Sequence, residues 1–163
     1  IPFWEKLCTT HNFTIPHTIT KGGETRFHSV KNGLEKINEY SLIAIHDGVR
    51  PLVSKNLIIN LISEVIEGVG IIPIIPLKDS IREVEGGNST HIDRSNLYKV
   101  QTPQCFLSDE IKEAYAQEYS EKFTDDASVF ECNNGKIRSL FGEEKNLKIT
   151  TGEDLKIASA LYY

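Results

Sequence analysis

An acid and an arginine follow directly on a short apolar run near the middle of the chain. The run is Leu42–Ile45, and Asp47, Gly48, Arg50 and Pro51 come after it. Ligands of open α/β sheets bind beyond the carboxyl ends of the strands, so this spacing would set a carboxylate and a guanidinium beside a substrate. The same residues also fit an Asp-Gly turn with Asp47 as a helix cap. From this stretch alone the two interpretations stay open.

A glycine turn that leads into a helix is the second feature with possible chemistry. Residues 21–26 read Lys-Gly-Gly-Glu-Thr-Arg, and Thr25 can cap a helix whose apolar positions are Phe27, Val30, Leu34 and Ile37. A strand is expected before the turn, over residues 13–20. Backbone N–H groups at a helix N-terminus can meet an anion or a base edge. A plain connection between strand and helix is the alternative.

The elements that position these residues alternate between strands and helices. The unbroken apolar run of residues 42–45 predicts a central strand, buried on both faces of a parallel sheet. Ser54 can cap an amphipathic helix that Gly68 ends. Residues 69–75 predict the next strand, and Pro73 within it indicates a strand near an edge or one that ends in a bend.

The pattern then changes to two short extended pieces around Gly86 and Gly87. Residues 80–93 predict a hairpin arm with too little apolar surface to be stable alone, so a symmetry-related subunit is its natural support. Pro103 predicts a constrained loop over residues 101–106.

The remaining residues predict further α/β units. Ser108 is expected to cap a helix over residues 109–119, and residues 123–128 to begin another. A strand over residues 136–140 precedes a final helix, which Thr151 and Asp154 open with the spacing of a capping box.

Length and charge restrict the class of protein. The chain has 163 residues, of which 39% are hydrophobic, enough for the core of one domain. Its formal net charge of −5 argues against a nucleic-acid-binding surface. Cys8, Cys105 and Cys132 form no metal-binding spacing and fit a reducing compartment. Since no apolar run is long enough to cross a bilayer, we expect a cytoplasmic protein without a membrane partner.

Four segments together carry a resemblance that no single one carries. They are residues 22–30, residues 46–51, residues 93–106 with the run Gln-Thr-Pro-Gln-Cys-Phe, and residues 124–151 with Thr-Asp-Asp-Ala-Ser and Asn-Leu-Lys-Ile-Thr-Thr. In this order they resemble the 2-C-methyl-D-erythritol 4-phosphate cytidylyltransferases, which join CTP to a phosphorylated polyol. The resemblance implies an α/β fold, with a Rossmann-like nucleotidyltransferase sheet, helices on both faces and a projecting β-hairpin arm that interlocks two subunits.

The resemblance also concerns the start of the chain. Family members begin with a strand and a glycine-rich loop whose arginine and lysine hold the triphosphate. This sequence opens at Ile1 and Pro2 and contains no methionine, so we expect a fragment or processed chain of one domain, residues 1–163, without that loop and inactive alone.

The resemblance further assigns roles to single residues. Arg94 and Lys148 would be catalytic, holding the polyol phosphate for in-line attack on the α-phosphorus of CTP, and Arg94 would serve the partner's site. The substrate-binding positions would be Asp47, Gly48, Arg50, Asp79, Ser80, Thr102 and Thr124. The nucleotide-binding positions would be Gly23, Glu24 and Ser29, of which Glu24 replaces the family's usual Asp. Without the motifs, Arg94 fits a salt bridge with Asp93 or with a neighbour at the foot of the arm, and Lys148 fits a solvated strand residue.

No residue is assigned as a metal ligand, and Mg²⁺ is expected to be bound mainly through the CTP phosphates. His46 lies at a strand end, but an ionised phosphate nucleophile needs no general base, so a structural role is expected. The alternatives are a cytidylyltransferase that forms CDP-ribitol and a non-catalytic dimerising domain that binds a nucleotide.

Overall fold

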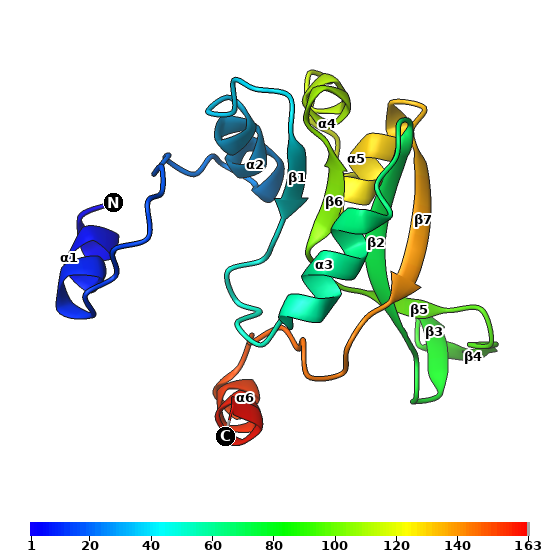
Figure 1. The fold of residues 1–163 in the computed structure, drawn as a ribbon. Helices are drawn as coiled ribbons and strands as arrows, with labels where there is room; N and C mark the ends of the chain where they lie inside the picture. Colours follow the sequence, from blue (N-terminus) through cyan, green and yellow to red (C-terminus); the bar gives the residue numbers. More distant parts are fainter. Residues whose placement is uncertain (163) are drawn as a thin grey trace.

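A five-stranded sheet with β2 (Val69–Pro76) at its centre is the main element of the computed structural model, which describes residues 1–162 (Figure 1). β7 (Lys136–Phe141) runs parallel to β2 along one edge. The other edge of β2 pairs antiparallel first with β6 (Gln104–Leu107) and then with β5 (Tyr98–Val100). β1 (Leu42–Ile45) lies beyond β6. The expected α/β class is confirmed.

β2 lies inside the sheet although it contains Pro73, so the expectation of a strand near an edge is wrong. β2 meets β6 at Ile71 and β5 at Ile74, so Pro73 stands where the antiparallel neighbour changes. A proline lacks the N–H that a ladder bond needs, and at this position its carbonyl still accepts from the N–H of Gln101 at 2.8 Å. The proline is tolerated in a central strand because the antiparallel ladder is interrupted there, while the parallel ladder to β7 continues through Pro73.

β1 departs from the expectation of a parallel strand buried on both faces. It pairs antiparallel with β6, from Leu42 opposite Leu107 to Ile45 opposite Gln104. Ile43 is buried, whereas Leu42 is 47% exposed. A run of four apolar residues specifies an extended segment but neither the direction nor the number of its neighbours, because both depend on residues far along the chain.

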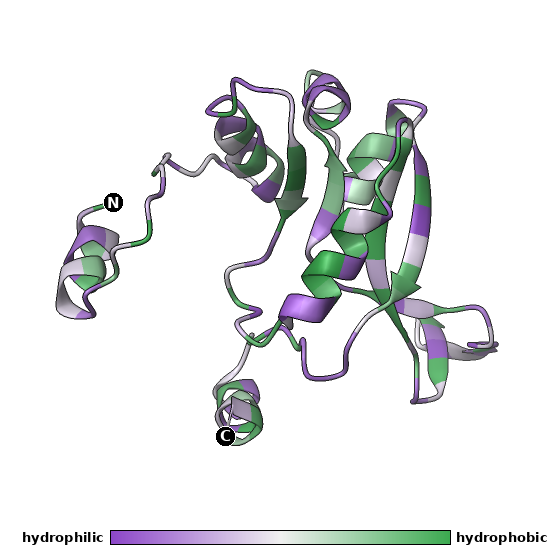
Figure 2. Cartoon of the chain, viewed as in Figure 1, coloured by the Kyte–Doolittle hydropathy of each residue, from purple (hydrophilic) through white to green (hydrophobic). Residues whose placement is uncertain are grey.

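Helices cover both faces of the sheet, as expected (Figure 1). α3 (Lys55–Ser63) packs Leu57 and Leu61 against Ile71 and Cys105. The opposite core joins α2 (Arg26–Leu34), α4 (Ser108–Ala114) and α5 (Asp126–Cys132) to the sheet. Its buried members are Phe27, Leu34, Ile43, Phe106, Ile111, Ala114, Tyr115, Val129 and Phe130. Figure 2 shows hydrophobic residues along β1 and β2 and on the side of α3.

Three of these helices begin at side-chain caps. Thr25 accepts from the N–H of His28, Ser54 from that of Leu57, and Asp125 from that of Ser128. The cap expected at Ser108 is wrong, because Ser108 is the first helical residue and its hydroxyl accepts from the N–H of Ser41. α3 ends at Ser63, earlier than the expected end at Gly68.

The expected hairpin arm is present. β3 (Ile81–Glu85) and β4 (Asn88–Ile92) pair antiparallel around Gly86 and Gly87, whose φ values are 55° and 85°. Two positive φ values in a two-residue loop match the twist of a hairpin and favour glycine. The arm projects beyond β5 in Figure 1. Residues 101–106 are not one loop as expected, since the chain re-enters the sheet as β6 at Gln104.

The two ends of the described chain lie away from the sheet (Figure 1). α1 (Pro2–Thr10) is followed by an irregular segment, so the strand expected over residues 13–20 is wrong. Trp4 there meets Phe13 and His17 with ring centroids 5.8 Å away in each case. α6 (Gly152–Tyr162) begins at the expected capping box of Thr151 and Asp154. Within residues 1–162, every helix is too short or too polar to cross a lipid bilayer.

Candidate active site

A cleft of about 270 Å³ lies where β1 ends and β6 begins. It is formed by the start of α2, the loop after β1, the Thr102 turn, the cap of α5 and the segment before α6. Its lining residues are Arg26, Asp47, Arg50, Val100, Gln101, Thr102, Gln104, Thr124, Asp125 and Lys148. The structure thus brings together five of the residues that the sequence singles out, which are Asp47, Arg50, Thr102, Thr124 and Lys148.

The Asp47 carboxylate is the centre of charge in this cleft. Its Oδ2 lies 3.3 Å from Lys148 Nζ and 3.4 Å from Arg50 Nε, and its Oδ1 lies 3.5 Å from Arg26 Nε. Burial raises the pKa of the Asp47 carboxyl, but Lys148, Arg26 and Arg50 outweigh burial, and the pKa falls below its ordinary value. Asp47 therefore carries its charge at neutral pH and gathers three cations around the cleft.

Two backbone contacts hold the loop after β1 against the segment before α6. Arg50 Nη1 donates to the carbonyl of Asn146 at 2.8 Å, and the N–H of Ile149 donates to the carbonyl of Val49 at 2.9 Å. These contacts fix the separation of the Asp47 loop from the backbone that carries Lys148. Arg50 thus has the bracing role that the sequence left open beside phosphate binding.

Thr102 links the loop after β1 to the turn before β6. Its hydroxyl accepts from the N–H of Asp47 at 3.0 Å and lies 2.9 Å from His46 Nδ1. His46 Nε2 lies 3.0 Å from the carbonyl of Arg50, which can only accept. A neutral His46 therefore donates from Nε2 and accepts the Thr102 hydroxyl hydrogen at Nδ1. This bonding agrees with the structural role expected of His46.

The far wall of the cleft is the capped start of α5. Asp125 accepts from the N–H of Ser128 at 2.9 Å and from Gln104 Nε2 at 2.9 Å. Gln104 Oε1 in turn accepts from the N–H of Ala127 at 2.8 Å, so a buried amide ties β6 to the helix. Thr124 stands exposed immediately before this cap, at the cleft wall.

The three predicted nucleotide-binding residues lie at the start of α2, outside the lining of the cleft. The N–H of Gly23 donates to Ser29 Oγ at 2.9 Å, and that hydroxyl donates to the carbonyl of Thr25 at 3.0 Å. A Cβ at Gly23 would overlap His28 Cβ, so this close turn needs glycine. Glu24 is exposed beside it.

The arm residues stay outside the cleft within this chain. Asp79, Ser80 and Arg94 are exposed and are absent from its lining. The salt bridge considered for Arg94 is not formed between the described residues, since Asp93 accepts from the N–H and hydroxyl of Ser95 at 3.0 and 2.6 Å. Gly48 adjoins Asp47 in the loop and is also exposed.

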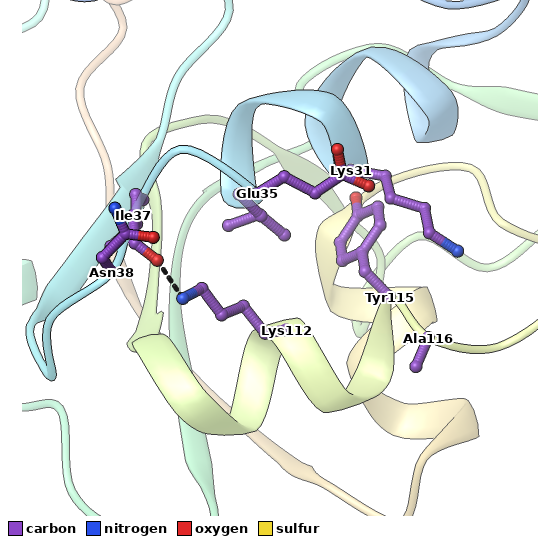
Figure 3. A pocket seen from close by; sticks show the side chains of 8 residues that line it. Lys31, Glu35, Ile37, Asn38, Lys112, Tyr115 and Ala116 are labelled. Carbon is purple, nitrogen blue, oxygen red and sulfur yellow. Dashed lines mark hydrogen bonds between the residues drawn. The ribbon is translucent and has the colours of Figure 1, made fainter.

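A second cavity of about 390 Å³ lies between α2 and α4 (Figure 3). Lys112 Nζ donates to the carbonyl of Ile37 at its edge, and Tyr115 forms part of its wall. Leu34 and Ile37 make much of the remaining lining apolar. None of the predicted site residues lines this cavity, and it shares no lining residue with the charged cleft.

Sequence reasoning missed four polar residues of the cleft, Arg26, Gln101, Gln104 and Asp125. Arg26 is the first residue of α2, where the helix dipole disfavours a cation. A cation at this unfavourable position indicates that a nearby acid pairs with Arg26. Gln104 and Asp125 meet across 21 residues, and their pairing had no signal in the local sequence.

The cleft offers little for direct metal binding. Among residues 1–162, His, Cys, Asp and Glu side chains form no cluster of three that would hold an ion. Both oxygens of Asp47 face cations, and both oxygens of Asp125 accept hydrogen bonds. The two acids that line the cleft are thus already engaged with cations or hydrogen-bond donors.

Cations and hydroxyl groups at the strand ends of a helix-covered sheet suit phosphoryl chemistry, which depends on positioning and on charge placed against phosphate oxygens. Fold and cleft together define an α/β transferase domain of the nucleotidyltransferase class. The chain belongs to the 2-C-methyl-D-erythritol 4-phosphate cytidylyltransferase family, whose sequence profile matches residues 5–162.

Individual relatives agree with this family. A protein of Bacteroides fragilis is 46% identical over 159 residues, which cover 98% of this chain and 73% of the relative. One of Azobacteroides pseudotrichonymphae is 47% identical over 162 residues, covering 98% and 72%. Both are named 2-C-methyl-D-erythritol 4-phosphate cytidylyltransferase.

Solved structures give the same result. The crystal structure of a 4-diphosphocytidyl-2C-methyl-D-erythritol synthase superposes with a TM-score of 0.86 at 28% identity, covering all of this chain and 77% of the other. The cytidylyltransferase of Thermus thermophilus superposes with a TM-score of 0.76 at 29% identity, covering 90% and 75%.

Proposed function

We propose that this protein joins CTP to 2-C-methyl-D-erythritol 4-phosphate, giving 4-diphosphocytidyl-2-C-methyl-D-erythritol and pyrophosphate. A phosphate oxygen of the polyol attacks the α-phosphorus of CTP in line. The bond from that phosphorus to the bridging oxygen breaks, and pyrophosphate leaves with the electron pair. The nucleophile is already ionised, so the protein needs no general base.

The observation that carries the proposal is the arrangement of Lys148, Arg50 and Arg26 around Asp47 in a cleft of the family's fold. Lys148 is 47% exposed and is the most open of these cations, so its ammonium is available to a phosphate. Asp47 keeps Lys148 near the cleft, and its carboxylate can also accept hydrogen bonds from polyol hydroxyl groups. The substrate roles of Asp79, Ser80, Thr102 and Thr124 are part of the same proposal.

The base and ribose of CTP would meet the turn before α2, at Gly23, Glu24 and Ser29. Gly23 gives the turn its close fit, and Ser29 holds it by accepting the Gly23 N–H. The backbone of Gly48 in the loop after β1 would approach the phosphates without a side chain in the way. Mg²⁺ would come bound to the CTP phosphates, neutralising part of their charge.

Arg94 would complete the site from a second subunit. The arm exposes Val84 to 70% and supplies little buried surface of its own, so it needs support that one chain does not give. A homodimer in which each arm lies on its partner would bring Arg94 toward the partner's cleft. We place this dimer in the cytoplasm, where CTP is available.

The test is an assay of the complete gene product with CTP, Mg²⁺ and 2-C-methyl-D-erythritol 4-phosphate, followed by phosphorus-31 NMR. The expected result is a CDP-polyol together with an equal amount of pyrophosphate. A parallel assay with ribitol phosphate distinguishes the CDP-ribitol alternative. Binding of CTP without product from either polyol phosphate would contradict the proposal and favour a non-catalytic nucleotide-binding domain.

A further inference from the structure

A buried carboxylate stands behind the cleft and holds one of its cations. Asp126, the second acid of the α5 start, has a side chain that is 0% exposed. Its Oδ1 accepts from Arg26 Nη1 at 2.8 Å and its Oδ2 from Arg26 Nη2 at 2.6 Å. This is the parallel two-bond geometry that fixes a guanidinium in position as well as in charge.

Tyr115 completes the coordination of this carboxylate. Its hydroxyl, carried by the residue that follows α4, donates to Asp126 Oδ1 at 2.6 Å, and the Tyr115 side chain is buried. Burial and the charge of Asp126 raise the pKa of Tyr115, so the hydroxyl remains a proton donor. Asp126 is therefore held from α2 and from the end of α4 while it belongs to α5.

The consequence for Arg26 lies in which of its nitrogens are occupied. Both terminal nitrogens point at Asp126, and Nε faces Asp47 Oδ1 at 3.5 Å. A guanidinium held in this way cannot offer its terminal pair to a phosphate or to Asp47. Lys148 and Arg50 share Asp47 Oδ2. Because Arg26 is held by Asp126, it does not compete with them for this oxygen.

We infer that Asp126 is a positioning residue for the cleft, acting through Arg26, and that Tyr115 supports it. It fixes Arg26 edge-on to Asp47, so that the Asp47 carboxylate stays paired with Lys148 and Arg50 in the arrangement that receives the polyol phosphate. The inference rests on the proposed function. It adds two residues, Asp126 and Tyr115, that support the substrate-contacting residues without touching substrate themselves.

Loss of the Asp126 charge has a defined effect in this arrangement. The side chain of Arg26 is 36% exposed, so once its terminal nitrogens are released it can rotate toward Asp47 and take both carboxylate oxygens. Lys148 then loses its ion pair with Asp47 and is no longer held at the cleft. The polyol phosphate is affected first, because the predicted nucleotide contacts lie at the Gly23 turn.

The first variant is Asp126→Asn in the complete gene product. We expect the KM for the polyol phosphate to rise about 10-fold, with the KM for CTP changed by less than about 2-fold. Asp109→Asn, at an exposed acid in the first turn of α4, is the matched control and should leave both constants unchanged. Tyr115→Phe removes one hydrogen bond and should raise the KM for the polyol phosphate about 2- to 3-fold without unfolding the protein.

The decisive comparison uses an Arg26→Gln background. If Asp126 acts through Arg26, adding Asp126→Asn to Arg26→Gln should cause no further rise in the KM for the polyol phosphate. A change in the melting temperature has no bearing on this comparison. A rise of the same size as in the protein with Arg26 would overturn the inference. So would an unchanged KM in both Asp126→Asn and Tyr115→Phe.

A measurement without substrate separates this inference from the proposed function. A crystal structure of Asp126→Asn without substrate should show the Arg26 guanidinium released from residue 126 and bonded to both oxygens of Asp47. A guanidinium that keeps its place on residue 126 would overturn the positioning role. The expected movement of Arg26, in a protein that makes no CDP-polyol, would support the anchor and contradict the proposed function instead.

Discussion

The hydroxyl of Thr102 accepts the backbone N–H of Asp47 at 3.0 Å, although 55 residues separate them. This contact joins the loop after β1 to the turn that begins β6, and it sets the backbone from which the Asp47 carboxylate reaches its cations.

Thr102→Val should therefore weaken both the fold and the site. It leaves the N–H of Asp47 and the Nδ1 of His46 without their partner, at a cost of about 1–3 kcal/mol in the free energy of unfolding. Thr102→Ser keeps the hydroxyl and is the matched control. Urea unfolding and steady-state assays measure the two effects. Equal stability of the valine and serine variants would contradict the role given to this hydroxyl.

Arg94→Ala is expected to impair use of the polyol phosphate selectively. We expect kcat/KM for that substrate to fall about 100-fold, through both a higher KM and a lower kcat, because a charged hydrogen bond to phosphate is lost. Binding of CTP, measured by calorimetry, should stay near normal. Arg82→Ala is a suitable control, since Arg82 lies on the arm and bonds Ser89 within it. An unchanged kcat/KM would remove Arg94 from the site.

Mixed dimers test whether Arg94 serves the partner's site. Homodimers of Arg94→Ala and of Lys148→Ala should each have little activity, and a heterodimer of the two regains one complete site only if Arg94 crosses to the neighbour. Random mixing should then give about a quarter of the unmodified activity, because half of the dimers are mixed and each has one intact site. Inactivity of heterodimers proven by mass spectrometry would place Arg94 and Lys148 in the same subunit's site.

Gly23→Ala should disturb the turn before α2. A Cβ there overlaps His28, so the turn must open, and the KM for CTP should rise about 10-fold while the melting temperature falls. Gly33→Ala, within α2, meets open space and should be neutral or stabilise the helix by up to about 1 kcal/mol. A CTP KM that is equally raised in both variants would assign the effect to α2 as a whole.

The stability that Asp47 gives should depend on pH with a definite sign. Its pKa in the folded protein is lower than its ordinary value of 3.8. Its contribution is therefore fully present above pH 3.8 and is lost as the pH falls through the lower, folded-state value. The melting temperature of Asp47→Asn should lie below that of the unmodified protein at pH 7 by about 3 °C, and the difference should shrink below pH 3.8. A difference that instead shrank above pH 7 would show that another group is responsible.

Local chemistry explains which elements were predictable. Thr25, Ser54 and Asp154 mark helix starts because a cap bonds an N–H only a few residues away, and Gly86–Gly87 marks a hairpin because the turn needs positive φ. The direction of β1 was not predictable in this way, since its partner β6 lies some 60 residues along the chain.

The same distinction between local and distant partners explains which site residues were predictable. Asp47, Arg50 and Lys148 were predictable because their motifs are contiguous and their groups suit phosphate. Arg26 was missed because the residue that gives it a role, Asp126, is 100 positions away. Pro73 was misinterpreted because the rule against prolines in central strands assumes an uninterrupted ladder, and β2 changes its neighbour there.

That change of neighbour along β2 has a consequence for how such a protein can diverge. Upstream of Pro73 the strand supports β6 and the charged cleft, and downstream it supports β5 and the root of the arm. The antiparallel ladder is broken at Pro73, although the parallel ladder to β7 continues and Val100 of β5 still lines the cleft. An exchange of the exposed arm beyond β5 would therefore leave the pairing of β2 with β6 in place. Surfaces that recognise a sister subunit can thus evolve at their own pace, separately from the reaction chemistry.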